Sequence, residues 1–340
     1  MDQVEDTSWA DGWSDTAVIQ AHPELHHYTT AETLGGMISS NSFWASHFRH
    51  LNDSTEVLGI AGRICPAWAL SFEKILRTMR KRPKVERAIV AAGGLRASAA
   101  SMAESLYDVL ADVTFGTATK PPTQTVSGAP FILSFCSHTS EPYEANNGLL
   151  SQWRGYSAGR GVCLVFDTQG LFKNLAAEYQ QFAYTHAGFH DVLYDRDDLC
   201  LEDEFPELFD AVDTHARIKL GLRIPDPGAE TISQFMVAAT RFKHRGFYEE
   251  REVRIVVCPV DDRFFAKDAK TRKPSLPAKP SFVIGGKERI ALFEGQARPL
   301  PLRRIIVGPS NDMDEVAKYA RDVTNGEVEI TISQTPFIPG

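Results

Sequence analysis

Residues 247–257 read FYEEREVRIVV, and the rest of the chain is organised around this stretch. Its second half is an apolar run typical of a buried strand, and its first half places carboxylates at the start of that strand. Side chains alternate along a strand, so Glu250, Glu252 and Arg254 are expected on one face. Charges at a strand entrance are costly to bury, so the pattern indicates either a functional site or a surface ion-pair ladder in which Arg254 neutralises Glu252.

The bulk composition is that of an ordinary globular protein. The chain is 43% apolar and 24% charged. Its length of 340 residues is enough for one large domain or two medium ones. The net charge of −8 argues against a protein that binds nucleic acid over its whole surface, but leaves room for a local basic groove. Five scattered cysteines and an acidic leader predict a cytoplasmic protein, and without an apolar run of roughly 20 residues we expect no membrane contact.

The order of apolar patterns predicts an α+β fold rather than a regular alternation of strands and helices. Expected strands are 25–30, 42–46, 131–136, 161–167, one or two within 182–194, the run at 250–257, 304–307 and 328–332. Expected helices are 31–40, 149–156, 197–223, 229–244 and 312–324. The predicted fold is a mixed or antiparallel β core of short strands with a large helical insert at about 56–115, followed by a linker at 116–130. Residues 1–20 are expected to be an acidic N-terminal extension, and 21–340 a single domain.

Two local features have both a structural and a functional interpretation. The turn Asn52-Asp53 can hydrogen-bond its own backbone and cap a helix that begins near Glu56. Trp153 and Tyr156 share one face of an expected helix, where aromatic side chains form either core or a ligand platform.

No metal site is expected, because the closest histidine pairs, His186 with His190 and His47 with His50, have no further ligands at suitable spacing.

A basic loop with two phenylalanines separates the strand at 250–257 from the C-terminal part of the chain. Its cations are Arg263, Lys267, Lys270, Arg272, Lys273 and Lys279, next to Phe264 and Phe265. Such a loop can contact a nucleic-acid backbone while the aromatic rings stack on bases. The alternative is a solvated, proline-rich loop without a ligand.

Several short motifs resemble, in order, a large bacterial family, the domain of unknown function 2971 family. The motifs are His27-Tyr28-Thr29, Phe43-Trp44-x-Ser46, Leu51-Asn52-Asp53-x-x-Glu56, Leu133-Ser134-Phe135, Trp153-x-x-Tyr156, Gly161-Val162-x-Leu164-x-Phe166-Asp167, Tyr248-Glu249-Glu250-x-Glu252-x-Arg254 and Ile305-Ile306-x-Gly308-Pro309. The resemblance runs from about residue 25 to 335, and the family name implies no activity.

A second, weaker resemblance is to ADP-ribosyltransferases. His27-Tyr28-Thr29 looks like their first motif, and Glu252, in a Glu-x-Glu arrangement with Glu250, looks like their catalytic glutamate. The resemblance implies a fold like theirs, NAD as substrate and no metal. The catalytic residues would be Glu252, Glu250 and His27. The residues that bind NAD would be His27, Tyr28, Thr29, Trp44, Ser46, Trp153, Tyr156 and Arg254, with the middle motif left open among Trp44, Ser46, Trp153 and Tyr156.

The residue types suit that chemistry, because cleavage of the bond between ribose and nicotinamide passes through an oxocarbenium-like state that a carboxylate stabilises. Two hypotheses follow. The first is an NAD-dependent ADP-ribosyltransferase, or an NAD glycohydrolase, that acts on a macromolecule such as a nucleic acid held by the basic loop. The second is a non-catalytic binding or regulatory module in which the strand of Glu252 is an ion-pair ladder. The first requires His27 and Glu252 to face each other across one cleft.

Overall fold

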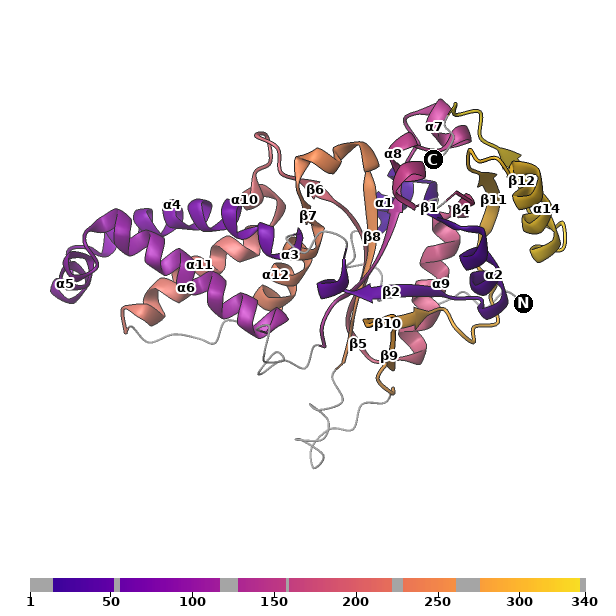
Figure 1. Cartoon of the computed structure of the whole chain (residues 1–340). Helices are drawn as coiled ribbons and strands as arrows, with labels where there is room; N and C mark the ends of the chain where they lie inside the picture. The colour runs from indigo at the N-terminus through magenta and orange to yellow at the C-terminus, as the bar shows by residue number, and fades with distance from the viewer. Residues whose placement is uncertain are drawn as a thin grey trace.

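The computed structural model describes residues 15–51, 56–116, 128–156, 159–221, 229–260 and 276–336. Within these ranges a large, mostly antiparallel sheet lies between a helical lobe and a smaller group of helices (Figure 1). The fold class predicted from the sequence is therefore confirmed. No helix in the described ranges combines the length and the apolar character needed to cross a membrane.

The sheet has a continuous path of strands and a branch. The path is β12-β11-β4-β1-β3-β2-β10-β9, and β8 pairs with the free side of β3 and then with β5. Only β11 and β12 run parallel within it. The bounds are β1 (Glu24–Thr30), β2 (Phe43–His47), β3 (Phe131–Cys136), β4 (Gly161–Asp167), β5 (Tyr184–Asp191), β8 (Glu252–Pro259), β9 (Ser281–Ile284), β10 (Lys287–Leu292), β11 (Leu302–Val307) and β12 (Glu329–Ile332). A separate ribbon pairs β6 (Leu193–Tyr194) with β7 (Phe242–Lys243).

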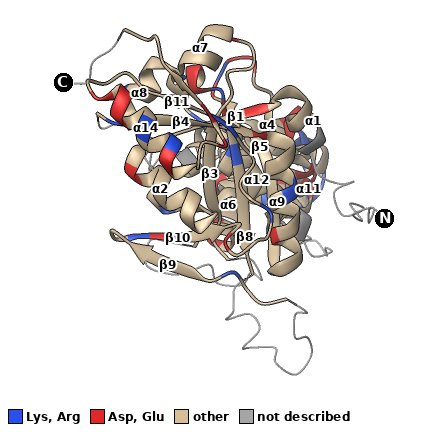
Figure 2. Ribbon diagram, turned by 90° about the vertical axis from the view of Figure 1, so that its right-hand side faces the viewer, with Lys and Arg blue, Asp and Glu red and all other residues tan. Residues whose placement is uncertain are grey.

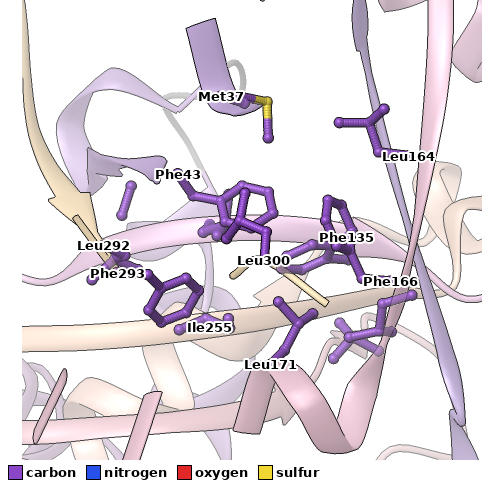
Figure 3. Packing of buried hydrophobic residues seen from close by; sticks show 14 of the residues in the cluster. Met37, Phe43, Phe135, Leu164, Phe166, Leu171, Ile255, Leu292, Phe293 and Leu300 are labelled. Carbon is purple, nitrogen blue, oxygen red and sulfur yellow. The ribbon is translucent and has the colours of Figure 1, made fainter. Parts of the chain in front are cut away.

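One face of the sheet carries α1 (Asp15–Ala21), α2 (Ala31–Ser40), α9 (Thr168–Gln181) and α14 (Met313–Val323). Their apolar side chains join the main buried cluster, whose packing is shown in Figure 3. Phenylalanines fill its centre, with Phe43 edge-on to Phe135, Phe166 and Phe293. Thr30 caps α2: its hydroxyl accepts a hydrogen bond from the backbone N–H of Thr33.

The opposite face carries the helical lobe and two short helices. The lobe comprises α3 (Glu56–Gly59), α4 (Ala61–Met79), α5 (Pro83–Ala91), α6 (Leu95–Phe115), α10 (Leu201–Glu204), α11 (Pro206–Lys219) and α12 (Ala229–Arg241). A second buried cluster joins these helices to the sheet through Ile132, Val256 and Cys258. The short helices α7 (Pro142–Asn147) and α8 (Leu150–Tyr156) cover the neighbouring strands through Trp153.

The structure adds to the sequence-based interpretation in three places. The expected insert at 56–115 forms one lobe with α10–α12, because both segments contribute to the same buried cluster. Residues 281–292, which carry no strong apolar alternation, form the hairpin β9–β10 around Gly285 and Gly286. The N-terminal segment counted with the acidic extension includes α1, whose Val18 is buried in the main cluster.

Candidate functional site

Glu252, the acid expected to be catalytic, is held in a buried ion-pair network. Both of its carboxylate oxygens accept hydrogen bonds from Arg254, at 2.7 and 3.0 Å, and one also accepts from Lys243 Nζ at 2.7 Å. Lys243 also donates to Glu250 at 2.7 Å, while the hydroxyl of Tyr194 accepts from the backbone N–H of Glu252. Glu252 and Arg254 share one face of β8 as predicted, but Glu250 does not belong to the strand, because it ends the short 3-10 helix Arg245–Glu250. The ladder is also buried rather than on the surface, with Glu252 only 4% exposed.

The two cations keep Glu252 ionised. Burial alone raises the pKa of this carboxyl, but the charge and hydrogen bonds of Arg254, followed by those of Lys243, outweigh burial and lower the pKa to about 2. A carboxylate with that pKa cannot exchange a proton with a substrate near neutral pH. The geometry therefore gives Glu252 a structural role, which ties β8 to the β6–β7 ribbon.

His27 lies on the other face of the sheet. Its ring packs 5.6 Å from the rings of Phe43 and Phe135 in the main buried cluster, and Nδ1 lies 3.1 Å from the carbonyl of Ser134. Val253, Ile255 and Val257 belong to the same cluster, so alternation along β8 directs Glu252 to the opposite face. The expected cleft between His27 and Glu252 is not formed, and these residues do not fit NAD as the resemblance implied.

Tyr28 and Trp153 do lie together, but both are buried and pack against each other instead of forming an open ligand platform. Their rings meet edge-on at 4.9 Å, and Trp153 Nε1 donates to the carbonyl of Asn147. The hydroxyl of Tyr28 accepts a hydrogen bond from the backbone N–H of Leu149.

Two other residues assigned to NAD binding are placed differently. Tyr156, at the end of α8, is exposed, whereas Thr29 belongs to the face of β1 that carries His27. The aromatic and threonine positions implied by the ADP-ribosyltransferase resemblance are thus spread over both faces of the sheet.

Trp44 and Ser46 lie on the outward face of the β9–β10–β2 edge. Trp44 is 45% exposed, with the ring of Phe282 edge-on at 5.6 Å and the guanidinium of Arg289 5.6 Å from its ring centre. Register places Arg289 opposite both Ser46 of β2 and Phe282 of β9. We call Trp44, Phe282 and Arg289 the aromatic face.

The β9–β10 hairpin lies at the lower edge of the sheet in Figure 2. The aromatic face is separate from the Glu252 network, because Glu252 pairs with Cys136 at one end of β3, whereas β2 pairs with Phe131 and Ile132 at the other end.

Two sequence features fall wholly or partly outside the described residues. Asn52 and Asp53 lie outside them, as does the side chain of Glu56, at which α3 begins. The basic residues Arg263, Lys267, Lys270, Arg272 and Lys273 also lie outside, so their contacts stay a prediction. Lys279, in contrast, is buried and donates to Glu178 at 2.7 Å.

Histidine pairs do not build a metal centre in the part of the chain that is described. His186 and His190 approach each other with their Nε2 atoms 2.9 Å apart; His190 is buried and His186 half-buried. Within the described ranges no three histidine, cysteine or acidic side chains form a group that could hold a metal ion.

A polar cluster that no sequence pattern indicated lies just beyond the end of β3. Ser137 Oγ lies 2.7 Å from His22 Nδ1, and His22 Nε2 lies 2.8 Å from Asp191 Oδ1. The next residue, His138, shares a 2.7 Å hydrogen bond with the Tyr28 hydroxyl on the other side of the segment. These residues are 110 to 169 positions apart, so no local motif could reveal them.

Residues 152–255 match the model of a family described as a protein of unknown function, DUF2971. The match covers α8 to the middle of β8, including Trp153, Glu252 and Arg254, and confirms the family resemblance that the sequence motifs indicated. No curated protein and no solved structure matches the chain. The ADP-ribosyltransferase resemblance gains no support from these comparisons.

Proposed function

We propose that this protein is a binding module for single-stranded nucleic acid, with the aromatic face as its docking surface. The observation that carries the proposal is the exposed Trp44 ring, which packs against the ring of Phe282 and the guanidinium of Arg289. An indole ring held in place offers a stacking surface to any base, because every base has a π-face.

The hydrogen bonding and the charge of Arg289 support the same ligand, a single-stranded nucleic acid. Its Nε atom is buried and has no hydrogen-bond partner among the described residues. A buried donor without a partner costs free energy. Because Arg289 as a whole is only half-buried, the rest of its guanidinium stays able to donate to a phosphate oxygen. Arginine is also the cation best suited to both stacking and phosphate recognition.

The charge of the neighbouring sequence completes the argument. Residues 263–273, which precede β9 in the chain, hold five cations and one acid despite the net charge of −8 for the whole protein. Single-stranded nucleic acids are bound by a combination of basic residues and exposed aromatic rings, and here the two are close in the sequence. NAD transfer stays an untested prediction without support from the geometry of Glu252.

The test is fluorescence anisotropy with labelled twelve-nucleotide oligo(U) and oligo(dT) at several salt concentrations. We expect binding that weakens with salt, and Trp44→Ala should lower the affinity by roughly 5- to 100-fold, the value of one base stacked on an aromatic ring. Neutralising Lys270, Arg272 and Lys273 together should also reduce the dependence on salt.

Tyr143→Ala is the matched control, because Tyr143 is an exposed aromatic residue on α7, at the other end of the molecule from β9 (Figure 1). It should bind as the wild type does. Failure of the wild type to bind either oligonucleotide at low salt would remove the proposal, and equal losses for Trp44→Ala and Tyr143→Ala would remove the aromatic face as the docking surface.

A further inference from the structure

Ser137, His22 and Asp191 meet at one end of the sheet from three separate segments. Ser137 follows β3, His22 follows α1, and Asp191 is the last residue of β5. The two contacts, 2.7 Å from Ser137 Oγ to His22 Nδ1 and 2.8 Å from His22 Nε2 to Asp191 Oδ1, are both within hydrogen-bond range. The histidine thus connects a hydroxyl to a carboxylate.

This connectivity is that of a nucleophile, a general base and an orienting carboxylate, an arrangement recognised by geometry rather than by sequence order. Compared with serine proteases, the two ring nitrogens of His22 exchange their roles. Neutral imidazole has one donor and one acceptor nitrogen, so either nitrogen can serve. With Nε2–H donating to Asp191, Nδ1 is left to accept the proton of Ser137.

The backbone of Ser137 is held from both sides by Arg251. The Ser137 N–H donates to the Arg251 carbonyl at 3.0 Å, and Arg251 Nε donates to the Ser137 carbonyl at 3.1 Å. Arg251 adopts a left-handed conformation, with φ of 44°. A residue other than glycine in that conformation stores strain, and such strain concentrates at functional sites. The serine is therefore positioned by a network that is independent of His22.

Access to the site is from the side of the acid. The side chains of His22 and Asp191 are 20% and 45% exposed, whereas Ser137 is 2% exposed. Thr139 Oγ1 lies 3.3 Å from Ser137 Oγ, and Thr139 is itself exposed. The hydroxyl of Ser137 has little open surface around it, which favours a small acyl group.

We propose that Ser137, His22 and Asp191 form a hydrolytic site for small carboxylic esters. Ser137 Oγ forms a bond to the carbonyl carbon while its proton passes to His22 Nδ1. The bond from that carbon to the alcohol oxygen then breaks, and the alcohol leaves with the proton from His22. Water attacks the acyl group on Ser137 and gives a proton to His22. Release of the acid then returns the proton to Ser137.

A fluorophosphonate probe tests this proposal on the whole protein without nucleic acid, so its outcome is independent of the proposed binding function. We expect covalent labelling of Ser137, mapped by peptide mass spectrometry, and hydrolysis of p-nitrophenyl acetate. Ser137→Ala should abolish both, while His22→Gln and Asp191→Asn should slow labelling at least about tenfold, since base and orienting acid act as one unit with the serine.

Ser140→Ala is the matched control, because Ser140 is an exposed serine three residues away. It should be labelled at the wild-type rate, and thermal unfolding of each variant separates loss of chemistry from loss of fold. Labelling of the wild type no greater than that of Ser137→Ala would overturn the proposal, as would equal rates in wild type and folded Asp191→Asn.

Discussion

The Glu252 network and the aromatic face use arginine in opposite ways. Arg254 is 1% exposed and donates to Glu252 and to the Thr240 carbonyl, so its charge is paired inside the protein. Arg289 lies beside the exposed Trp44, and its Nε has no partner among the described residues. A cluster of charged residues in the sequence can therefore serve only to stabilise the fold. An arginine beside an exposed aromatic residue is the better indication of a binding site.

The largest expected effect is loss of stability in the buried network. Arg254→Ala removes the main partner of a buried carboxylate, so the free energy of unfolding should fall by about 3–5 kcal/mol. Arg289→Ala is the matched substitution on the aromatic face, and it should cost less than about 1 kcal/mol. Urea denaturation measures both. Equal losses would show that the two arginines do not differ as the structure indicates.

A loss of stability of intermediate size is expected when the pH is lowered, because the described part of the chain holds several buried histidines. Burial is the main cause that lowers the pKa of His26 to about 4 and that of His138 to about 2. Below pH 6.5 the unfolded chain binds protons that the folded protein does not, so the free energy of unfolding should fall as pH decreases from 6.5 towards 4. Each such histidine lowers the free energy of unfolding by at most about 1.4 kcal/mol per pH unit in this range.

The contribution of Glu252 to the free energy of unfolding changes at lower pH. Its depressed pKa stabilises the fold above about pH 4.5, and that contribution is lost as pH falls through about 2.

Urea titrations at pH 7, 6 and 5 measure the histidine contribution, because the Glu252 contribution is lost only at lower pH. His26→Gln should reduce the pH dependence between 6.5 and 4. A free energy of unfolding that stays constant from pH 7 to 5 would contradict this account.

Local patterns predicted the elements but not their assembly. The strand at Glu252, the cap of Thr30 on α2 and the C-terminal strand-helix-strand unit follow from alternation and capping, which act over a few residues. Lys243 as the partner of Glu252, the helical lobe and the contact of Ser137 with His22 depend on which strands pair, and no short-range pattern determines that. For the same reason the sequence grouped His27 with Glu252, although pairing in the sheet directs them to opposite faces.

The smallest expected effect is that of Glu252→Gln on the cleavage of NAD. Glu252 is 4% exposed and both of its oxygens are bonded to cations, so a ribose hydroxyl has no access to the carboxylate, and wild type and Glu252→Gln should release equal, background amounts of nicotinamide from labelled NAD. The same substitution should still destabilise the fold, because Arg254 and Lys243 lose their charged partner. The pair of measurements separates the two roles: turnover in the wild type that disappears in folded Glu252→Gln would restore a catalytic glutamate, whereas lost stability without turnover assigns Glu252 to the scaffold.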